Sequence, residues 1–501
     1  MFRVKHLPID THAEHVIVIH EQAVRSGNLG FNPLDRAYVT GANPETGEVR
    51  EITGVLDFCR NTLIEPEEMG FSDQAFRDLG LPEGALVNAT LAVPPRSVDL
   101  VRDKLHGQRL KRHHFDAILT DVVGHRYSHV ELSMFVLATA LRGLDTEELV
   151  DYTRAMIDTG TRLDFGAGPI ADKHCVGGIP GNRTTMIVVP ILVARGVKVP
   201  KTSSRAITSS AGTADTMAML ADVALKPERL REVVEKAGGC IAWGGALELA
   251  PADDILITVE RPMEIDTEAQ MVASILAKKK TAGATHVLID IPVGPTAKVR
   301  TLDAAEALRT MFISVAEKID LKVEVLTTET RGPIGRGIGP RLEALDVLAV
   351  LRRDPDAPED LREKSLFLAS RLLEMTGAAE DNAGYRSAEE ALDSGAALAA
   401  LERIIEAQGV RSIPKEAAYK HRVAARFDGR IREIDNWEIA RVAKRAGAPA
   451  NVSSGVVLLR TVGDVVARGE PLFEIHAEST QQIEFARAYT DAHPQMFRYG
   501  F

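Results

Sequence analysis

The sequence predicts a multidomain α/β protein with four parts: an N-terminal β-rich extension, a helical lobe, an α/β lobe with a mostly parallel sheet, and a C-terminal α+β domain. The chain has 501 residues, which at about 150 residues per domain is too many for one core. From residue 163 onward short apolar strands alternate with helical patterns, as in α/β domains. The two ends of the chain instead show β-rich alternation broken by turn residues.

Composition excludes several classes of protein. The formal net charge of −11 disfavours a nucleic-acid binder, which needs a basic surface. The longest strongly apolar run, MIVVPILVA at 186–194, is far shorter than the roughly 20 residues of a membrane span. Three scattered cysteines fit neither a disulfide framework nor a zinc site. We therefore expect a cytoplasmic protein that binds no membrane and no nucleic acid polymer.

The elements follow in order along the chain. Residues 1–85 mix alternating runs such as EHVIVIH with turn signals, which predicts a small β unit. From 97 to about 160 the periodicity is helical, and two helix starts carry capping boxes, Ser128 with Glu131 and Asp145 with Glu148. The predicted strands of the α/β lobe are 169–175, 197–204, 286–293 and 321–328, and further helices are predicted at 267–283, 341–376 and 387–408.

The stretch DKHCVGGIPGNRTT at 172–185 is the strongest candidate for chemistry. It combines a strand, a glycine turn and the start of a helix. Such a junction presents backbone N–H groups and the positive end of the helix dipole, and its glycines let an anion approach closely. Lys173 adds a charge, and Thr184 and Thr185 add hydroxyl donors. Taken alone, glycines with a lysine are weak evidence, and an ordinary tight turn is the commoner explanation of the pattern.

A second stretch, KTSSRAITSSAGTADTMAML at 201–220, strengthens this interpretation. Serine and threonine side chains surround Arg205 after a predicted strand. A solvated loop is the plain alternative. Loops at the carboxyl ends of neighbouring parallel strands, however, converge on one crevice. We therefore favour an anion site.

Other polar residues have both a functional and a structural interpretation. Ser274 and Lys278 are four residues apart and share a helix face. Asp266 precedes that helix, and from spacing alone a role at the helix N-terminus explains it at least as well as a catalytic one. His125 and His129 have the spacing of a metal pair, but the helix start at Ser128 falls between them. We expect no metal.

Five segments resemble the thymidine phosphorylase and pyrimidine-nucleoside phosphorylase family: DKHCVGG, SSRAITSSAGTAD, ASILAKK, HVLIDIPVG and GEPLFEIHAES. The similarity runs from about residue 86 to the end and is strongest to the longer branch that includes AMP phosphorylases, whose typical extension matches residues 1–85. The resemblance implies a homodimer or larger homo-oligomer that uses inorganic phosphate as co-substrate and no cofactor. Phosphate attacks the anomeric carbon of a nucleoside or nucleotide, and the base leaves.

The resemblance also implies roles for individual residues. The phosphate-binding set is Lys173, Cys175, Gly178, Thr185, Ser203 and Thr213. The substrate-binding set is Ser204, Arg205, Ala206, Ile207, Thr208, Ser209, Arg261, Ser274, Lys278 and Lys298. The proton donor is Asp266 or His174. Cys175 stands where the short pyrimidine enzymes have serine, which puts thymidine in doubt as the substrate. Asp266 and Lys298 instead fit the AMP phosphorylase branch, so a nucleoside 5′-monophosphate is a serious candidate substrate.

We assign residues 1–85 to the extension and 86–162, joined by about 250–282, to the helical lobe. Residues 163–249 and 283–415 form the α/β phosphate-binding lobe, and 416–501 the C-terminal domain. Two further functions stay open: an anthranilate-type phosphoribosyltransferase, which would need Mg²⁺, and a non-catalytic nucleotide sensor.

Overall fold

The computed structural model describes residues 1–11, 14–27, 29–206, 209–265 and 267–500. It divides into two compact units: Met1–Thr159 with Pro251–Gln270, and Gly160–Ala250 with Met271–Phe501. The predicted multidomain α/β class is confirmed. Every helix in the described ranges is too short or too polar to cross a lipid bilayer.

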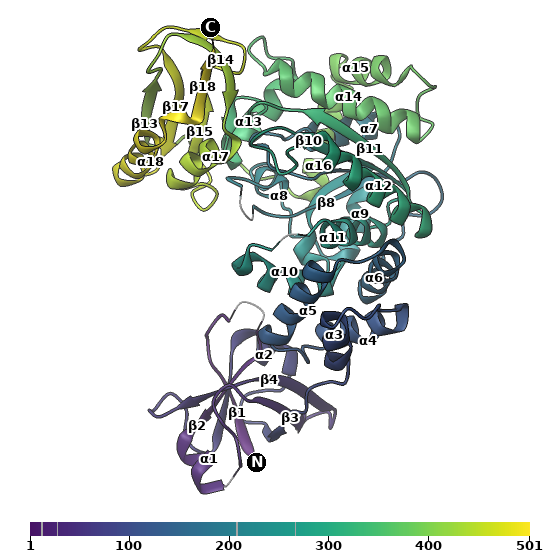
Figure 1. Cartoon of the computed structure of the whole chain (residues 1–501), viewed down its shortest axis with the longest axis vertical. Coiled ribbons are helices and arrows are strands. Elements are labelled where there is room, and N and C mark those ends of the chain that lie inside the picture. The colour runs from purple at the N-terminus through teal and green to yellow at the C-terminus, as the bar shows by residue number, and fades with distance from the viewer. Residues whose placement is uncertain (12–13, 28, 207–208, 266, 501) are drawn as a thin grey trace. The chain divides into compact units, whose positions relative to one another are not determined.

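The first unit begins with a closed β-barrel of strand order β1-β5-β2-β4-β3-β6. The strands are β1 (Phe2–His6), β2 (Val16–His20), β3 (Arg36–Ala42), β4 (Val49–Cys59), β5 (Glu68–Phe71) and β6 (Leu86–Leu91), with helices α1 (Glu21–Gly27) and α2 (Asp73–Leu79) between them. Side chains that alternate along the strands fill the interior; Ile17 and Ile19 of β2 are fully buried. Figure 1 shows the barrel in purple.

Helices complete the first unit: α3 (Ser97–Leu105), α4 (Arg112–Val123), α5 (His129–Arg142), α6 (Thr146–Thr159) and α10 (Pro251–Met263). Both predicted capping boxes are present. The Ser128 hydroxyl accepts from the Glu131 amide while Glu131 accepts from the Ser128 amide. Asp145 and Glu148 make the same exchange at the start of α6. These caps fix where α5 and α6 begin.

The second unit contains a three-stranded parallel sheet, β11-β10-β7, and a two-stranded one, β8-β9, which an isolated bridge between Ile170 and Lys198 joins into one sheet. Its strands are β7 (Ala171–Cys175), β8 (Val199–Ser203), β9 (Gly239–Trp243), β10 (His286–Val293) and β11 (Lys322–Glu329). The chain runs outward from β7 to β9 and then returns to β10 on the other side of β7. Such a reversal opens a crevice at the carboxyl ends of the two central strands.

Helices cover both faces of this sheet: α7 (Thr185–Ala194), α8 (Thr213–Met217), α9 (Pro227–Ala237), α11 (Glu268–Thr281), α12 (Leu302–Lys318), α13 (Pro340–Arg352), α14 (Glu359–Met375), α15 (Gly384–Asp393) and α16 (Ala396–Gln408). The helix predicted at 341–376 is two helices, because Arg353 adopts a left-handed conformation and Pro355 and Pro358 follow. The helix predicted at 387–408 is also divided, at Gly395 with φ 81°.

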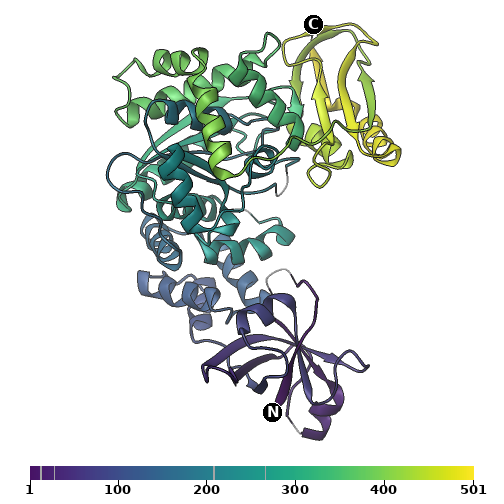
Figure 2. The same cartoon turned by 180° about the vertical axis from the view of Figure 1, so that it is seen from behind.

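The C-terminal residues form two small antiparallel sheets, β12-β15-β17-β13 and β16-β14-β18, packed with two helices (Figure 2). The elements are β12 (Gly337–Ile338), β13 (Tyr419–Ala424), β14 (Gly429–Ile434), β15 (Gly455–Leu458), β16 (Val465–Val466), β17 (Pro471–Ala477), β18 (Phe497–Gly500), α17 (Asn436–Arg445) and α18 (Thr480–Ala492). β12 lies in the segment between β11 and α13, so this domain is tied to the α/β core through a shared sheet.

Candidate active site at the carboxyl edge of the parallel sheet

Two loops meet where β7 and β10 end. A Cβ atom on Gly178, in the loop after β7, would lie 2.7 Å from the backbone nitrogen of Lys298, in the loop after β10. Gly178 also has a φ of 89°, which favours glycine. Gly181 is equally constrained, since its Cβ would lie 2.1 Å from the carbonyl oxygen of Ile334. The glycines of this stretch therefore allow three backbone segments to pack together.

Lys173 is the central cation of this edge. Its side chain is 1% exposed, and its ammonium donates to the Thr184 hydroxyl at 3.0 Å, at the start of α7. The Asp290 carboxylate on β10 lies 3.9 Å away. Burial lowers the pKa of Lys173, while Cys175 and Asp290 act in the opposite direction. An arriving anion would favour the charged ammonium for the same electrostatic reason.

Arg183 links the loop after β7 to the loop after β8. Its guanidinium donates to the Thr213 hydroxyl at 3.1 Å and to the Ala211 carbonyl at 2.8 Å. Its other side contacts the buried carboxylate of Glu343 on α13. Thr213, the first residue of α8, is thus held beside the glycine turn that follows β7. The structure brings together the two loops that the sequence predicted to converge.

Asp290 belongs to a buried charge cluster that sequence reasoning missed. Its carboxylate accepts from Thr328 at 2.8 Å and lies 3.0 Å from the ammonium of Lys364 on α14. Burial alone raises the pKa of Asp290, but Lys364 and Lys173 overcome this and hold it below its usual value. A lone aspartate in an otherwise apolar strand was the one available signal for this cluster.

A second cluster lies around Asp172, the residue before Lys173. Its carboxylate is 2.8 Å from the Lys279 ammonium on α11 and 3.4 Å from that of Lys201 on β8. All three side chains are at least 96% buried. Because successive side chains of a strand point to opposite faces, this cluster and the one around Asp290 lie on opposite sides of β7.

His174 and Cys175 are uncharged at neutral pH. Burial and the nearby ammonium groups, led by Lys279, lower the pKa of His174 well below its ordinary value. Burial, and then the charge of Asp290, raises the pKa of the Cys175 thiol. The sulfur accepts a hydrogen bond from Asn182 at 3.3 Å. Cys175 is therefore suited to hydrogen bonding and unsuited to nucleophilic attack.

The other predicted residues occupy several places. Thr185 is buried at the start of α7, and Ser203 is half-buried at the end of β8. Ser204, Ala206 and Ser209 lie in the loop that follows, where the Arg205 guanidinium stacks over Trp243 at 5.1 Å. Ser274 and Lys278 are half-buried one turn apart on α11, and the Thr267 hydroxyl at the start of that helix accepts from the Gln270 amide. Arg261 is exposed on α10 in the first unit. Ile207, Thr208 and Asp266 lie outside the described residues.

This arrangement can bind an oxyanion. Hydrogen-bond donors surround the glycine turn that follows β7. They are the amides in the first turn of α7, the ammonium of Lys173 and the hydroxyls of Thr184 and Thr213. Beside this turn, three buried or nearly buried basic side chains, Lys173, Arg183 and Lys364, are accompanied by two carboxylates, Asp290 and Glu343. The positive charge that an anion needs is therefore supplied locally, although the chain as a whole is acidic.

Family models match three segments of the chain. Residues 167–398 match the glycosyl transferase family a/b domain, residues 98–160 its helical bundle domain, and residues 430–493 the pyrimidine nucleoside phosphorylase C-terminal domain. Among solved structures, anthranilate phosphoribosyltransferase from Thermus thermophilus superposes with a TM-score of 0.53 at 19% identity, covering 62% of this chain and 99% of that one. The Saccharomyces cerevisiae enzyme gives 0.50 at 14% identity, covering 62% and 97%. Both likenesses concern the fold.

Curated relatives match nearly the whole chain. A "Putative thymidine phosphorylase" of Methylococcus capsulatus is 47% identical, covering 97% of this chain and 94% of that protein. Proteins of the same description from Polaromonas sp. and Legionella pneumophila are 46% and 45% identical, each covering 97% of this chain and 94% and 92% of their own lengths. The chain therefore belongs to the glycosyl transferase family that contains these thymidine phosphorylase relatives, with its helical bundle, α/β and pyrimidine nucleoside phosphorylase C-terminal domains.

Proposed function

We propose that this chain catalyses the reversible phosphorolysis of an N-glycosidic bond, giving a free base and a pentose phosphate. The observation that carries the proposal is the buried ammonium of Lys173, directed at the first residues of α7 beside a glycine turn. A fully buried lysine destabilises the fold unless its charge is compensated by an anionic or hydrogen-bonding partner. An inorganic phosphate at this position would be such a partner. The descriptions of the family relatives support the same reaction.

Phosphate binding here would supply the nucleophile. Cleavage of the bond develops positive charge on the sugar and negative charge on the base. A phosphate held by Lys173, the Thr184 and Thr213 hydroxyls and the amides of α7 would be oriented for attack, which replaces a bimolecular encounter by a positioned one. The phosphate-binding roles of Cys175, Gly178, Thr185 and Ser203 belong to this proposal.

The departing base requires a proton or a hydrogen bond. Because burial and the nearby ammonium groups lower the pKa of His174 well below its ordinary value, its imidazole is uncharged near neutral pH and has no acidic proton to give. We propose Asp266 as the proton donor and His174 as a neutral hydrogen-bonding group. Arg261, Ser274, Lys278 and Lys298 are the proposed contacts of the nucleoside or nucleotide. Three lysines and arginines in this set suit a substrate that carries its own phosphate.

Incubation with inorganic phosphate and a panel of nucleosides and nucleoside 5′-monophosphates tests the proposal. We expect phosphate-dependent release of free base, followed chromatographically, from at least one member of the panel, either thymidine or AMP. Binding of the panel without base release would instead indicate a nucleotide sensor and would refute the catalytic proposal.

The same assay with phosphoribosyl diphosphate and Mg²⁺ tests the phosphoribosyltransferase alternative. Within the described residues of this sheet edge, Asp172, Asp290 and Glu343 are each paired with lysine or arginine. Carboxylates used in this way are poorly placed to coordinate Mg²⁺. We expect no transfer from the diphosphate, whatever base is supplied.

A further inference from the structure

Three metal-ligating side chains converge in the first unit, far along the chain from the residues of the sheet edge. His15 precedes β2 of the barrel, Asp78 lies on α2, and His125 follows the end of α4. One possible ligand atom from each residue lies within 4.8 Å of the other two. The group is therefore assembled from the barrel and the helical lobe together.

The geometry around His15 is that of a ligand held in place. Its side chain is 4% exposed, and its Nδ1 lies 3.1 Å from the carbonyl oxygen of Thr53 on β4. A ring N–H that donates to a backbone carbonyl fixes the tautomer and leaves Nε2 as the coordinating atom, an arrangement common among histidines that bind metals. His15 Nε2 in turn lies 2.8 Å from the Asp78 carboxylate.

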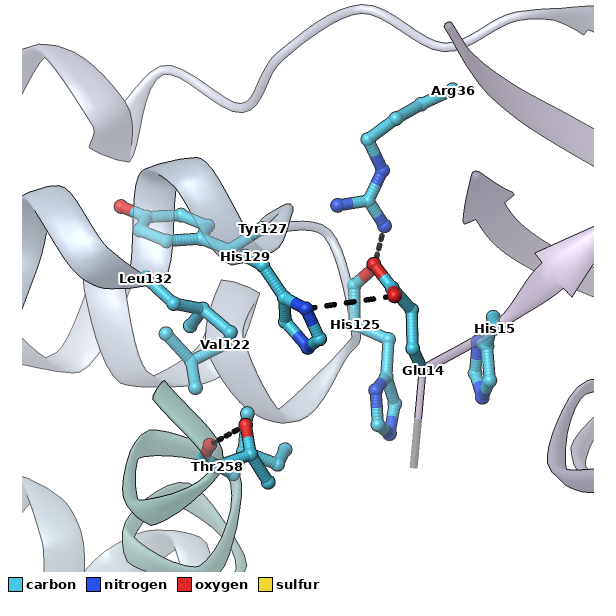
Figure 3. A pocket seen from close by; sticks show the side chains of 10 residues that line it. Glu14, His15, Arg36, Val122, His125, Tyr127, His129, Leu132 and Thr258 are labelled. Atoms are coloured by element: carbon cyan, nitrogen blue, oxygen red, sulfur yellow. Dashed lines mark hydrogen bonds and ion pairs between the residues drawn. The ribbon is translucent and has the colours of Figure 1, made fainter. Parts of the chain in front are cut away.

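His125 supplies the second imidazole. Its ring centroid is 4.2 Å from that of His15, and Figure 3 shows the two rings side by side at the edge of a small cavity. The His125 backbone has a φ of 51°, an uncommon conformation for a residue other than glycine, and its carbonyl accepts from Arg36. The fold therefore holds this histidine in a conformation that costs energy.

We propose that His15, Asp78 and His125 bind one divalent transition-metal ion, with zinc as the best match. Two imidazoles and one carboxylate, with a water in the remaining position, form a known type of four-coordinate zinc site. The Asp78 side chain is 38% exposed, so this side of the group is open for a water and for entry of the ion. Tetrahedral coordination needs ligand atoms about 3.3 Å apart, and the three ligand atoms already lie within 4.8 Å of one another.

The proposed ion would connect two parts of the first unit. Two ligands come from the barrel, and the third comes from the helical lobe, so coordination ties the extension to the helices. This role is independent of the proposed phosphorolysis, and none of the three residues is assigned there. The spacing of His125 and His129 suggested a metal pair in the sequence, but His129 faces Glu14 at 3.5 Å instead.

Zinc binding by the full-length chain tests this proposal. After dialysis against a chelator we expect the wild-type chain to take up one Zn²⁺, measured by elemental analysis and calorimetry, and to unfold at a higher temperature when zinc is present. Asp78→Asn removes a partly exposed ligand without disturbing the barrel interior, and we expect at least about tenfold weaker binding. His125→Asn removes an imidazole while keeping a residue that tolerates the left-handed backbone, with the same expected loss.

Matched controls separate the site from general histidine and carboxylate binding. His6 and Asp73 form another histidine–carboxylate pair in the barrel, at 2.6 Å. Asp73→Asn and His129→Asn should leave zinc affinity unchanged. Cobalt bound to the wild-type chain should give the visible absorption of a tetrahedral site, and Asp78→Asn should abolish it. Zinc affinity in the wild type no higher than in the Asp78→Asn, His125→Asn double variant would overturn the proposal and leave His15 and Asp78 as a hydrogen-bonded pair.

Discussion

The two faces of β7 carry clusters of the same composition that differ in one respect. On each face a buried aspartate meets two lysines: Asp290 with Lys173 and Lys364, and Asp172 with Lys201 and Lys279. On the Asp172 face both lysines also donate to the Thr202 carbonyl, a fixed backbone acceptor.

Lys173 instead donates to a side-chain hydroxyl at the start of a helix. A hydroxyl is both donor and acceptor and can rotate, so this hydrogen bond can be exchanged for one to an arriving anion. Two clusters with the same number of aspartate and lysine side chains can therefore have different roles. We infer that the Asp172 cluster stabilises the sheet and that the Lys173 side serves the ligand.

The largest effect is expected from Asp172→Asn. This change leaves Lys201 and Lys279 buried without their carboxylate, and breaking a buried pair in this way costs about 3–5 kcal/mol. We expect a fall in unfolding temperature of several degrees, measured by thermal denaturation. A variant as stable as wild type would show that the cluster is not structural.

Lys173→Met should give the next largest effect, on activity. Methionine fills a similar volume without charge, and loss of one preorganised donor to a reacting anion typically lowers kcat about 10²–10³-fold. Initial rates of base release at saturating phosphate measure this loss. The unfolding temperature should be unchanged or higher, because a buried charge has been removed. Full activity would separate Lys173 from the reaction.

Thr184→Val should act on phosphate more weakly. It removes the hydroxyl that receives the Lys173 ammonium and keeps the shape of the side chain. We expect the KM for phosphate to rise about tenfold, equivalent to one hydrogen bond to a charged group. Thr490→Val is a matched control at a buried threonine of the same unit, whose hydroxyl donates to the Ala486 carbonyl within α18. An equal rise in both variants would argue against a specific contact.

The smallest effect at neutral pH is expected from Lys201→Met. Burial lowers the pKa of Lys201 to about 7 from an ordinary value of 10.5. Between these values the unfolded chain binds more protons than the folded one, so the contribution of Lys201 to stability rises with pH. Denaturation curves from pH 7 to 10 should show a smaller rise for the variant than for wild type. Parallel curves would contradict the lowered pKa.

Sequence reasoning located the parts of the fold that have local signals. The capping boxes at Ser128 and Asp145 and the glycine turn after Cys175 are encoded within a few residues, and they appear where expected. β9 was missed, because GCIAW is short and begins within the glycine pair Gly238–Gly239. The break at Arg353 was also missed, although two prolines nearby indicated it.

The site was predictable only in part. The glycine and hydroxyl content of the loops after β7 and β8 indicated that both belong to a binding site. A hydrogen bond from Arg183 to Thr213 connects the two loops. Glu343 and Lys364 lie on helices more than 150 residues beyond the turn, and nothing in their local sequence marks them. Long-range partners of buried charges depend on tertiary packing, which a single sequence does not reveal.

The closed barrel at the N-terminus has a consequence for assembly. Pairing of β1 with both β5 and β6 closes the ring, although among the described residues β2 pairs only with Val55–Cys59 of β4 and β1 only with Leu86 and Val87 of β6. A second molecule therefore finds little strand edge to extend, and we expect its contacts with residues 1–91 to be formed mainly by side chains and loops. Self-association through this part of the chain is accordingly open to tuning by single surface substitutions.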